Sequence, residues 1–419
     1  MGEMMKKIIT IIFILALSIN IFAVTEIDSD IYLNPNPAAK ALNEKSEFYF
    51  PGITFDLSLA NSLISLGDVS IFQEDRVMTE ADKKLLTRKN LDIFYHNNTA
   101  IFKLAIKNFE VDYSLISNMN LQLLHKEFAK LILYGNSEDE YSVNNSEGSI
   151  GYVFSKTKFS YAYPKSVNLS FIPEINTHYE ALEKSVNFIR ELPLYFGANV
   201  NFYYPFLYGE VVKSRQNFGS TFENTYANYD LQLLYTDITG KYKIKKSLTA
   251  GVGFGMMADF NKGKFFIDFD DIFAGLSYKD LVMKEYQGAF VDTLTHLDSD
   301  YEFVSNDTTI TNTQNRKKKI SNNFSTSIEY NFYKNYVAKM EYKKSKYSYP
   351  NGFNVEVRNK FFHFFPTAFK IGRDEVTYYQ FTAGLNFQQL QFYTSLTTYG
   401  GFFNYSKGIG VKFMWIHKF

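Results

Sequence analysis

The sequence predicts an all-β fold: a transmembrane antiparallel barrel of about 14 strands, roughly 12 to 16, with short helical insertions near the N-terminus. Three observations predict it. Apolar and aromatic residues alternate with polar or small ones in many segments, which is the period of a strand with two different faces. No apolar run beyond residue 23 reaches the ~20 residues of a membrane-spanning helix. The last alternating segment, residues 407–419, ends on Phe419.

Residues 1–23 have the composition of a secretory signal peptide. Lys6 and Lys7 precede an apolar run from Ile8 to Leu17, and the small residue Ala23 stands where a peptidase could cut. Because this run is shorter than a spanning helix, a membrane anchor is the weaker interpretation. We therefore expect export across the inner membrane. The chain contains no cysteine, which excludes disulfides and lipidation through a cysteine.

The residues after the expected cleavage site divide into a short segment and a barrel. Residues 24–46 contain the sequence NPNPAAKAL, and we expect this segment to lie in the periplasm or the lumen. Residues 47–419 form the expected barrel, interrupted by two helices. The first covers residues 74–89, where apolar residues lie on one side and Thr79 and Asp82 have the spacing of a capping pair. The second covers residues 121–134, where apolar residues recur at helical spacing.

The alternation also predicts which side chains face lipid. In a transmembrane barrel the apolar face meets lipid and the polar face lines the lumen. The lipid-facing set then includes Val200, Ile328, Phe381 and Leu385, and the lumenal set includes Ser327, Thr382 and Gly384. A soluble sandwich would show the same period with the apolar faces packed together. The long polar insertions and the terminal Phe419 favour the barrel.

Phe413, Trp415 and Phe419 fall on one face of the last segment. This strand resembles the C-terminal signature of outer-membrane barrels, from which His417 is a mild departure. The resemblance implies recognition by the barrel-assembly machinery and a place in the outer membrane of a Gram-negative-type envelope. Outer-membrane lipid and lipopolysaccharide are then the expected surroundings. The basic run at residues 316–319 is expected in a solvated loop, with lipopolysaccharide contact as the alternative.

Asn36, Pro37 and Ala38 resemble the Asn-Pro-Ala motif near the mature N-terminus of the FadL-like outer-membrane transporters of fatty acids and hydrocarbons. An uncharacterised branch of that superfamily is the closer likeness in layout. The resemblance implies a 14-stranded barrel whose N-terminal segment plugs the lumen and through which a hydrophobic ligand passes. The glycine-rich stretch that usually precedes the motif in these transporters is missing. The alternative interpretation of the motif is a simple turn before a short helix.

Nothing in the sequence predicts an enzyme, a cofactor or a metal site. The six histidines lack metal-ligand spacing, and Asp268, Asp270 and Asp271 lack the remaining ligands of a calcium loop, so we interpret them as a polar turn. The 44 basic and 44 acidic residues balance, which argues against a nucleic-acid partner.

Three functions remain open from the sequence. The first is uptake of a hydrophobic small molecule. The second is a scaffold or shuttle barrel for exported surface proteins, which transports nothing. The third is a general porin, which we favour least because the lumenal positions that can be assigned are glycine, serine, threonine and asparagine.

Overall fold

The computed structural model describes most of the chain, and the statements below concern these parts of it. They are residues 36–42, 48–73, 76–134, 141–145, 149–170, 187, 190–220, 224–237, 246–260, 262–293, 308–320, 322–333, 336–344, 352–359, 364–373, 376–387 and 390–418. The expected signal peptide, most of residues 24–46 and Phe419 lie outside them.

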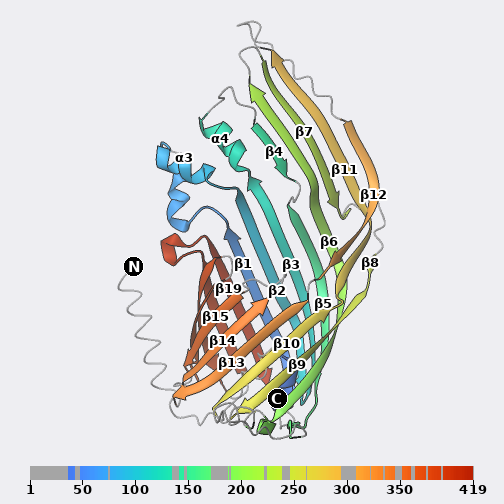
Figure 1. Ribbon diagram of the computed structural model, residues 1–419, viewed down its shortest axis with the longest axis vertical. Helices are drawn as coiled ribbons and strands as arrows, with labels where there is room; N and C mark the ends of the chain where they lie inside the picture. Colours follow the sequence, from blue (N-terminus) through green and yellow to red (C-terminus); the bar gives the residue numbers. More distant parts are fainter. Residues whose placement is uncertain are drawn as a thin grey trace, which may run out of the picture.

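Fourteen strands of the described residues form a closed antiparallel ring (Figure 1). The ring closes where β1 pairs with β19, from Ala60 opposite Gly408 to Tyr49 opposite Lys418. The predicted strand number is therefore confirmed. In ring order the strands are β1 (Phe48–Asn61), β2 (Leu91–Ile106), β3 (Phe109–Leu124), β5 (Ile150–Ala162), β6 (Leu194–Ser220), β9 (Thr249–Phe260), β10 (Gly263–Ile272), β13 (Asn323–Tyr333), β14 (Tyr336–Lys344), β15 (Gly352–Asn359), β16 (Thr367–Arg373), β17 (Thr377–Asn386), β18 (Leu390–Tyr399) and β19 (Gly408–Lys418).

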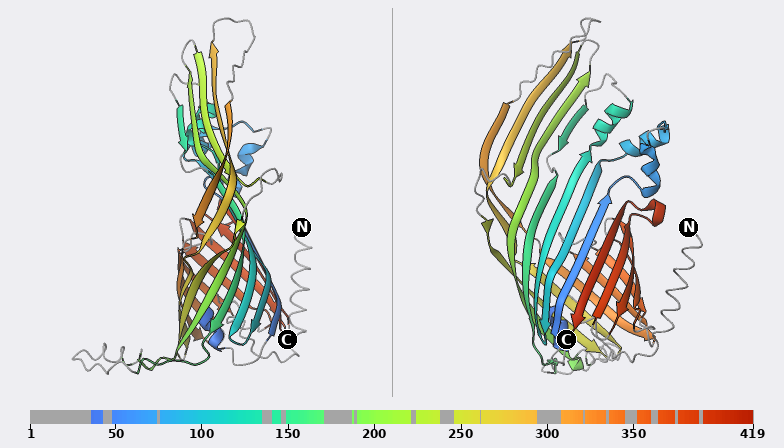
Figure 2. Two further views of the ribbon diagram at one scale, coloured as in Figure 1. Left: turned by 90° about the vertical axis from the view of Figure 1, so that its right-hand side faces the viewer. Right: turned by 180° about the vertical axis from the view of Figure 1, so that it is seen from behind.

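A second sheet, which we call the extension, stands beyond one end of the barrel (Figure 2). The 27-residue strand β6 runs through both parts, pairing with β9 in the barrel and with β7 in the extension. β11 pairs with both β7 and β12, while the short β4 pairs with the far end of β6. The strands outside the ring are β4 (Tyr141–Asn145), β7 (Asn224–Tyr235), β8 (Lys246–Ser247), β11 (Gly275–Thr293) and β12 (Thr308–Lys319).

Strands of the extension continue into barrel strands without reversing direction. β7 and β9 are consecutive long strands, yet both run antiparallel to β6. β10 and β11 likewise follow one another in one direction, as do β12 and β13. The basic run at residues 316–319 therefore lies in β12, and its predicted place in a loop is wrong.

The two faces of the barrel wall differ as expected for a protein that spans a membrane. Val200, Ile328, Phe381 and Leu385 lie on the outside with 40 to 54% of their surface exposed. Residues next to them in sequence, such as Ser327, are buried on the lumenal side. An apolar exterior around a polar interior is the inverse of a soluble barrel. The chain is a transmembrane β-barrel.

Lysine substitutions on the two faces of β17 should differ sharply in cost. Phe381→Lys places a charge in hydrocarbon and should lower the free energy of unfolding by ~2–4 kcal/mol near the bilayer midplane. Thr382→Lys, one position along and facing the lumen, should cost clearly less. Denaturant titration of the protein in vesicles measures both, and equal losses would contradict the assignment of faces. Gly384 is unsuitable as a lumenal control, because a Cβ there would lie 2.6 Å from the ring of Tyr393.

The helices lie at the end of the barrel that carries the extension. α3 (Glu80–Thr87) is shorter than the predicted helix at 74–89, because it begins only after Thr79, whose side chain and that of Asp82 form the expected capping box. α4 (Lys126–Tyr134) begins later than predicted, because residues 121–124 continue β3 and pair with β2. Two 3₁₀ helices complete this end, η2 (Leu66–Phe72) and η3 (Phe403–Tyr405). No helix in the described ranges is long and apolar enough to cross a membrane.

Candidate functional site

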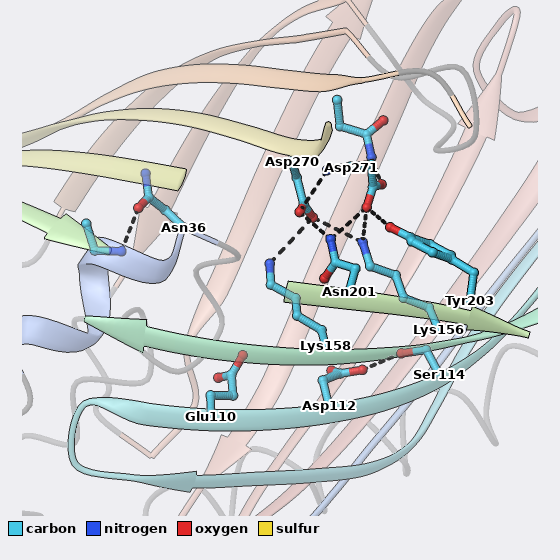
Figure 3. Close-up of polar contacts among 12 residues, drawn as sticks. Asn36, Glu110, Asp112, Ser114, Lys156, Lys158, Asn201, Tyr203, Asp270 and Asp271 are labelled. Carbon is cyan, nitrogen blue, oxygen red and sulfur yellow. Dashed lines mark hydrogen bonds and ion pairs between the residues drawn. The ribbon is translucent and has the colours of Figure 1, made fainter. Parts of the chain in front are cut away.

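A short 3₁₀ helix, η1 (Pro37–Leu42), lies inside the barrel near the end opposite the extension (Figure 2). It packs against the lumenal side of β5, β6 and β9. Asn36 fixes its start: the side-chain Nδ2 donates to the backbone oxygens of Met256, at 3.2 Å, and Ile267, at 2.8 Å. The Asn36 Oδ1 accepts a hydrogen bond from the backbone nitrogen of Ala38 at 2.8 Å (Figure 3). One amide thus joins the first turn of η1 to two neighbouring strands of the wall.

Two glycines make room for this contact. Gly197 of β6 and Gly255 of β9 stand opposite each other in the register. A Cβ on Gly255 would lie 2.0 Å from the Asn36 Oδ1, and a Cβ on Gly197 would lie 2.5 Å from the backbone nitrogen of Ala38. Neither position can hold a larger residue unless η1 moves, since real Cβ atoms do not approach this closely. We call this flat area of wall the glycine seat.

The rest of η1 is held by apolar packing and by a buried ion pair. Ala38 and Ala39 pack on Met257 and Phe266 of the wall. The Nζ of Lys40 lies 2.8 Å from Oε2 of Glu110, and both side chains are at most 5% exposed. Lys103 approaches the same carboxylate at 3.3 Å. Removing one partner of such a pair leaves an uncompensated buried charge, which is strongly destabilising.

A network of charged and polar side chains lines the lumen beside η1 (Figure 3). The Nζ of Lys156 lies 3.0 Å from Asp270 and 2.8 Å from Asp271, and Lys158 lies 3.6 Å from Asp270. Asn201 donates to both carboxylates, and Tyr203 donates its hydroxyl hydrogen to Asp271. We call these residues the lysine–aspartate network. The prediction of a polar turn at these aspartates is wrong, because both belong to β10. The lysines that neutralise them belong to β5.

A second set of ion pairs lines the opposite part of the wall, across β13 to β16. Its contacts are Lys339 with Glu329 and Glu341, Arg358 with Glu329 and Glu356, and Lys370 with Glu356. The expectation that the lumen is lined by small neutral residues is therefore wrong. Charged residues such as Glu329 and Lys339 alternate with the lipid-facing residues of β13 and β14 and therefore point inward as well. The charges are nevertheless paired, so they do not form a ring of one sign.

Aromatic side chains gather where the barrel meets the extension. Tyr152 and Phe154 of β5 pack with Tyr203 and Tyr208 of β6 and with Tyr278 of β11. All five are at most 8% exposed, and the rings of Tyr208 and Tyr278 lie 4.9 Å apart. From one end to the other, this side of the lumen therefore presents η1, the lysine–aspartate network and the aromatic cluster.

The residues singled out from the sequence fall into two places. Asn36, Pro37 and Ala38 lie together in the lumen at the glycine seat. Phe413 and Trp415 lie on the outer face of β19, where both rings contact Phe392 of β18. Phe419 is outside the described residues, so the assembly signal stays a prediction. Sequence reasoning missed Lys40 and Glu110, which no local pattern connects. The glycine seat did leave a signal, since Gly251, Gly253 and Gly255 recur at alternate positions of one strand.

The sequence matches no protein-family model and none of the curated proteins with which it was compared. Among solved structures it is similar to the toluene transporter TbuX of Ralstonia pickettii, with 8% identity, 92% of each chain covered and a TM-score of 0.44. It is also similar to the toluene transporter TodX of Pseudomonas putida, with 7% identity, 92% of each chain covered and a TM-score of 0.46. A FadL homologue of Pseudomonas aeruginosa has 9% identity, 92% coverage of each chain and a TM-score of 0.39.

These likenesses are remote. The similar structures are FadL-type barrels, the family that the Asn-Pro-Ala motif resembles, and the agreement concerns the fold alone. With identities below one tenth and TM-scores below 0.5, they assign no residue role and no ligand in this chain.

Proposed function

We propose that this chain is an outer-membrane channel for the uptake of hydrophobic small molecules, and that η1 is its plug. The observation that carries the proposal is the placement of η1. A segment outside the strand ladder occupies the lumen and is fixed to the wall by a side-chain amide, a glycine seat and one buried ion pair. Such contacts are specific enough to hold a plug and few enough to be released together.

The chemistry of the lumen supports a hydrophobic solute over an ion. The aromatic cluster fills the part of the barrel that adjoins the extension with packed rings, so the wall there is apolar. In the described strands the two sets of lumenal charges are ion-paired, and these pairs combine both signs, unlike the rings of one charge that select ions in a porin. The resemblance of the Asn-Pro-Ala motif to the FadL-like transporters points the same way.

Removal of residues 36–42 tests the plug. We would compare the full chain and the deletion variant in vesicles whose outer leaflet is lipopolysaccharide, through which apolar dyes pass slowly. The full chain should speed entry of an apolar dye but not of a polar dye of similar size. The deletion variant should admit both, because the wall at the seat is then uncovered. Folding of the variant is checked by its heat-modifiable electrophoretic mobility. Unchanged entry of both dyes after deletion would contradict a plug.

The extension favours a second function, a scaffold for exported surface proteins. Four long strands carry a sheet well beyond the barrel, which a channel alone does not need (Figure 1). A variant shortened in β6, β7, β11 and β12 beyond the barrel separates the two functions. It should keep dye entry if the chain is a channel. Loss of protease-accessible surface proteins from cells that carry the shortened variant, with no dye entry through the full chain, would instead support the scaffold.

A further inference from the structure

Exposed apolar side chains gather on the outside of the barrel rim, away from the lumen. They belong to η2 and η3, which Figure 1 shows in blue and red beside the upper ends of β1 and β19. We call this group the rim patch, and its members are Leu66, Val69, Phe72, Phe402, Phe403 and Tyr405, with 47 to 78% of their surface exposed. A contiguous apolar surface of this kind usually marks contact with another molecule or with a membrane.

The rim patch is rigidly built. The backbone nitrogen of Leu66 donates to the oxygen of Ser406 at 2.8 Å, which ties η2 to the residue after η3. Ser406 is fully buried and donates to the oxygen of Gly408 at 2.5 Å. Phe403 has a φ of 50°, a left-handed conformation that is unfavourable for a residue with a Cβ. The fold thus holds a phenylalanine in a strained backbone position while leaving 70% of its surface exposed.

The rim patch continues the lipid-facing surface of the barrel. Ile409, Val411 and Phe413 follow η3 directly along β19 and are 40 to 42% exposed on the outer face. Leu59, near the end of β1 that leads to η2, is 52% exposed on the same wall. Apolar surface therefore runs from the middle of the wall past the rim without a change of face. The surroundings of the wall are lipid, so the same surroundings extend to the rim patch.

Three basic residues border the patch. Arg88 and Lys89 follow α3 and are exposed, and Lys407 follows η3 and is half-buried. The backbone oxygen of Lys407 accepts a hydrogen bond from the backbone nitrogen of Asn61 at 2.8 Å, and Ser62 donates its hydroxyl hydrogen to the backbone oxygen of Asn90 at 2.7 Å, which brings Lys407 close to Arg88 and Lys89. Burial, and after it the positive charges of Lys89 and Arg88, lower the pKa of Lys407. Among the described residues none of the three basic side chains forms an ion pair. Cations beside an apolar surface at a membrane boundary suit an anionic lipid headgroup.

We propose that the rim patch inserts among the acyl chains of the adjoining leaflet, and that Arg88, Lys89 and Lys407 bind the phosphate of a lipid in that leaflet. The proposal rests on the transmembrane barrel and not on transport, so it stands whether or not the channel does. It is independent of the basic run at residues 316–319, for which contact with lipopolysaccharide was the alternative to a solvated position.

Tryptophan fluorescence tests the insertion. The chain has one tryptophan, so Trp415→Phe provides a silent background. In that background, Phe403→Trp is compared with Val411→Trp on the lipid-facing wall and with Thr313→Trp on the exposed strand β12. In vesicles of brominated phosphatidylcholine, Phe403→Trp should be quenched most by bromines close to the headgroup, and Val411→Trp by deeper ones. Thr313→Trp should be unquenched. If Phe403→Trp behaves like Thr313→Trp, the patch faces water and the proposal is wrong.

A charge-matched pair of variants tests the phosphate. Wild-type protein should unfold at a higher temperature in phosphatidylcholine vesicles that contain phosphatidic acid, a phosphomonoester lipid, than in vesicles without it. Arg88→Gln with Lys89→Gln should lose most of this shift. Lys279→Gln with Lys317→Gln removes the same charge from the extension and should keep it. Equal shifts in the two double variants would show a general charge effect and overturn the assignment.

Discussion

Replacing Gly255 by valine should push η1 off the lumen wall while leaving the barrel folded. The added side chain would enter the space of Asn36, whose Oδ1 lies 2.0 Å from the position of the new Cβ. The wall strands are fixed by their ladders, so the short helix is the part that can move. Overpacking of this kind costs about 1–3 kcal/mol, which would raise the displaced fraction about 5- to 150-fold.

Thiol labelling measures the displacement directly, because the chain has no cysteine of its own. Ala41→Cys places a probe on η1, where the native side chain is 8% exposed. A polar maleimide should label it slowly in the otherwise native chain and rapidly when Gly255→Val is added. Gly209→Val is the matched control on β6, since a Cβ there meets nothing within 4 Å. Slow labelling in the Gly255→Val variant would show that η1 is not held at the glycine seat.

Replacing Lys156 by methionine should destabilise the barrel more than any loss of a surface ion pair. Lys156 lies within 3.0 Å of two carboxylates, and its side chain is 15% exposed. Without it, Asp270 and Asp271 keep Asn201 and the more distant Lys158 but lose their main countercharge. Breaking a buried pair by removing one partner costs about 3–5 kcal/mol.

Two comparisons make this result specific. Lys83→Met removes the exposed pair with Glu80 on α3 and should cost less than about 1 kcal/mol. Adding Asp271→Asn to Lys156→Met should restore part of the loss, because one uncompensated charge disappears. Denaturant unfolding in vesicles gives all the free energies. A Lys156→Met variant as stable as Lys83→Met would mean that water, not Lys156, solvates the two aspartates.

The sequence predicted the barrel because its main signal is local. Alternation along single strands identified which residues face lipid, and Phe381 and Ile328 lie where the period places them. The helix expected at 74–89 was predicted from its apolar side and its capping pair, which are also local signals, and the capping pair marks where the shorter α3 begins. The start of α4 was misplaced because Leu121 and Leu124 fit helical spacing, yet the chain satisfies their backbone groups in the ladder with β2.

Only the part of the candidate site that belongs to the Asn-Pro-Ala motif could be predicted from the sequence. Asn36 stood out in the sequence, but the carbonyls it binds are 220 and 231 residues away. The partnership of Lys40 with Glu110, and of Lys156 with Asp271, depends on which strands become neighbours in the ring. Alternating strand directions along the sequence also misplace residues 205–272, because β7 and β9 follow one another in the same direction.

Because strands continue from the barrel into the extension without reversing, the length of the extension can change while the barrel stays the same. β6 runs from the barrel into the extension, where β7 pairs with it and β11 pairs with β7. Side chains alternate between the two faces of a strand, so removal of residues in pairs from the parts of these strands in the extension leaves the lumenal side chains of the barrel facing inward. The ring keeps the same number of strands whatever the height of the sheet above it. Insertions and deletions in this chain should therefore accumulate in the outer arms of β6, β7, β11 and β12, where they change the height of the extension without altering the diameter of the barrel.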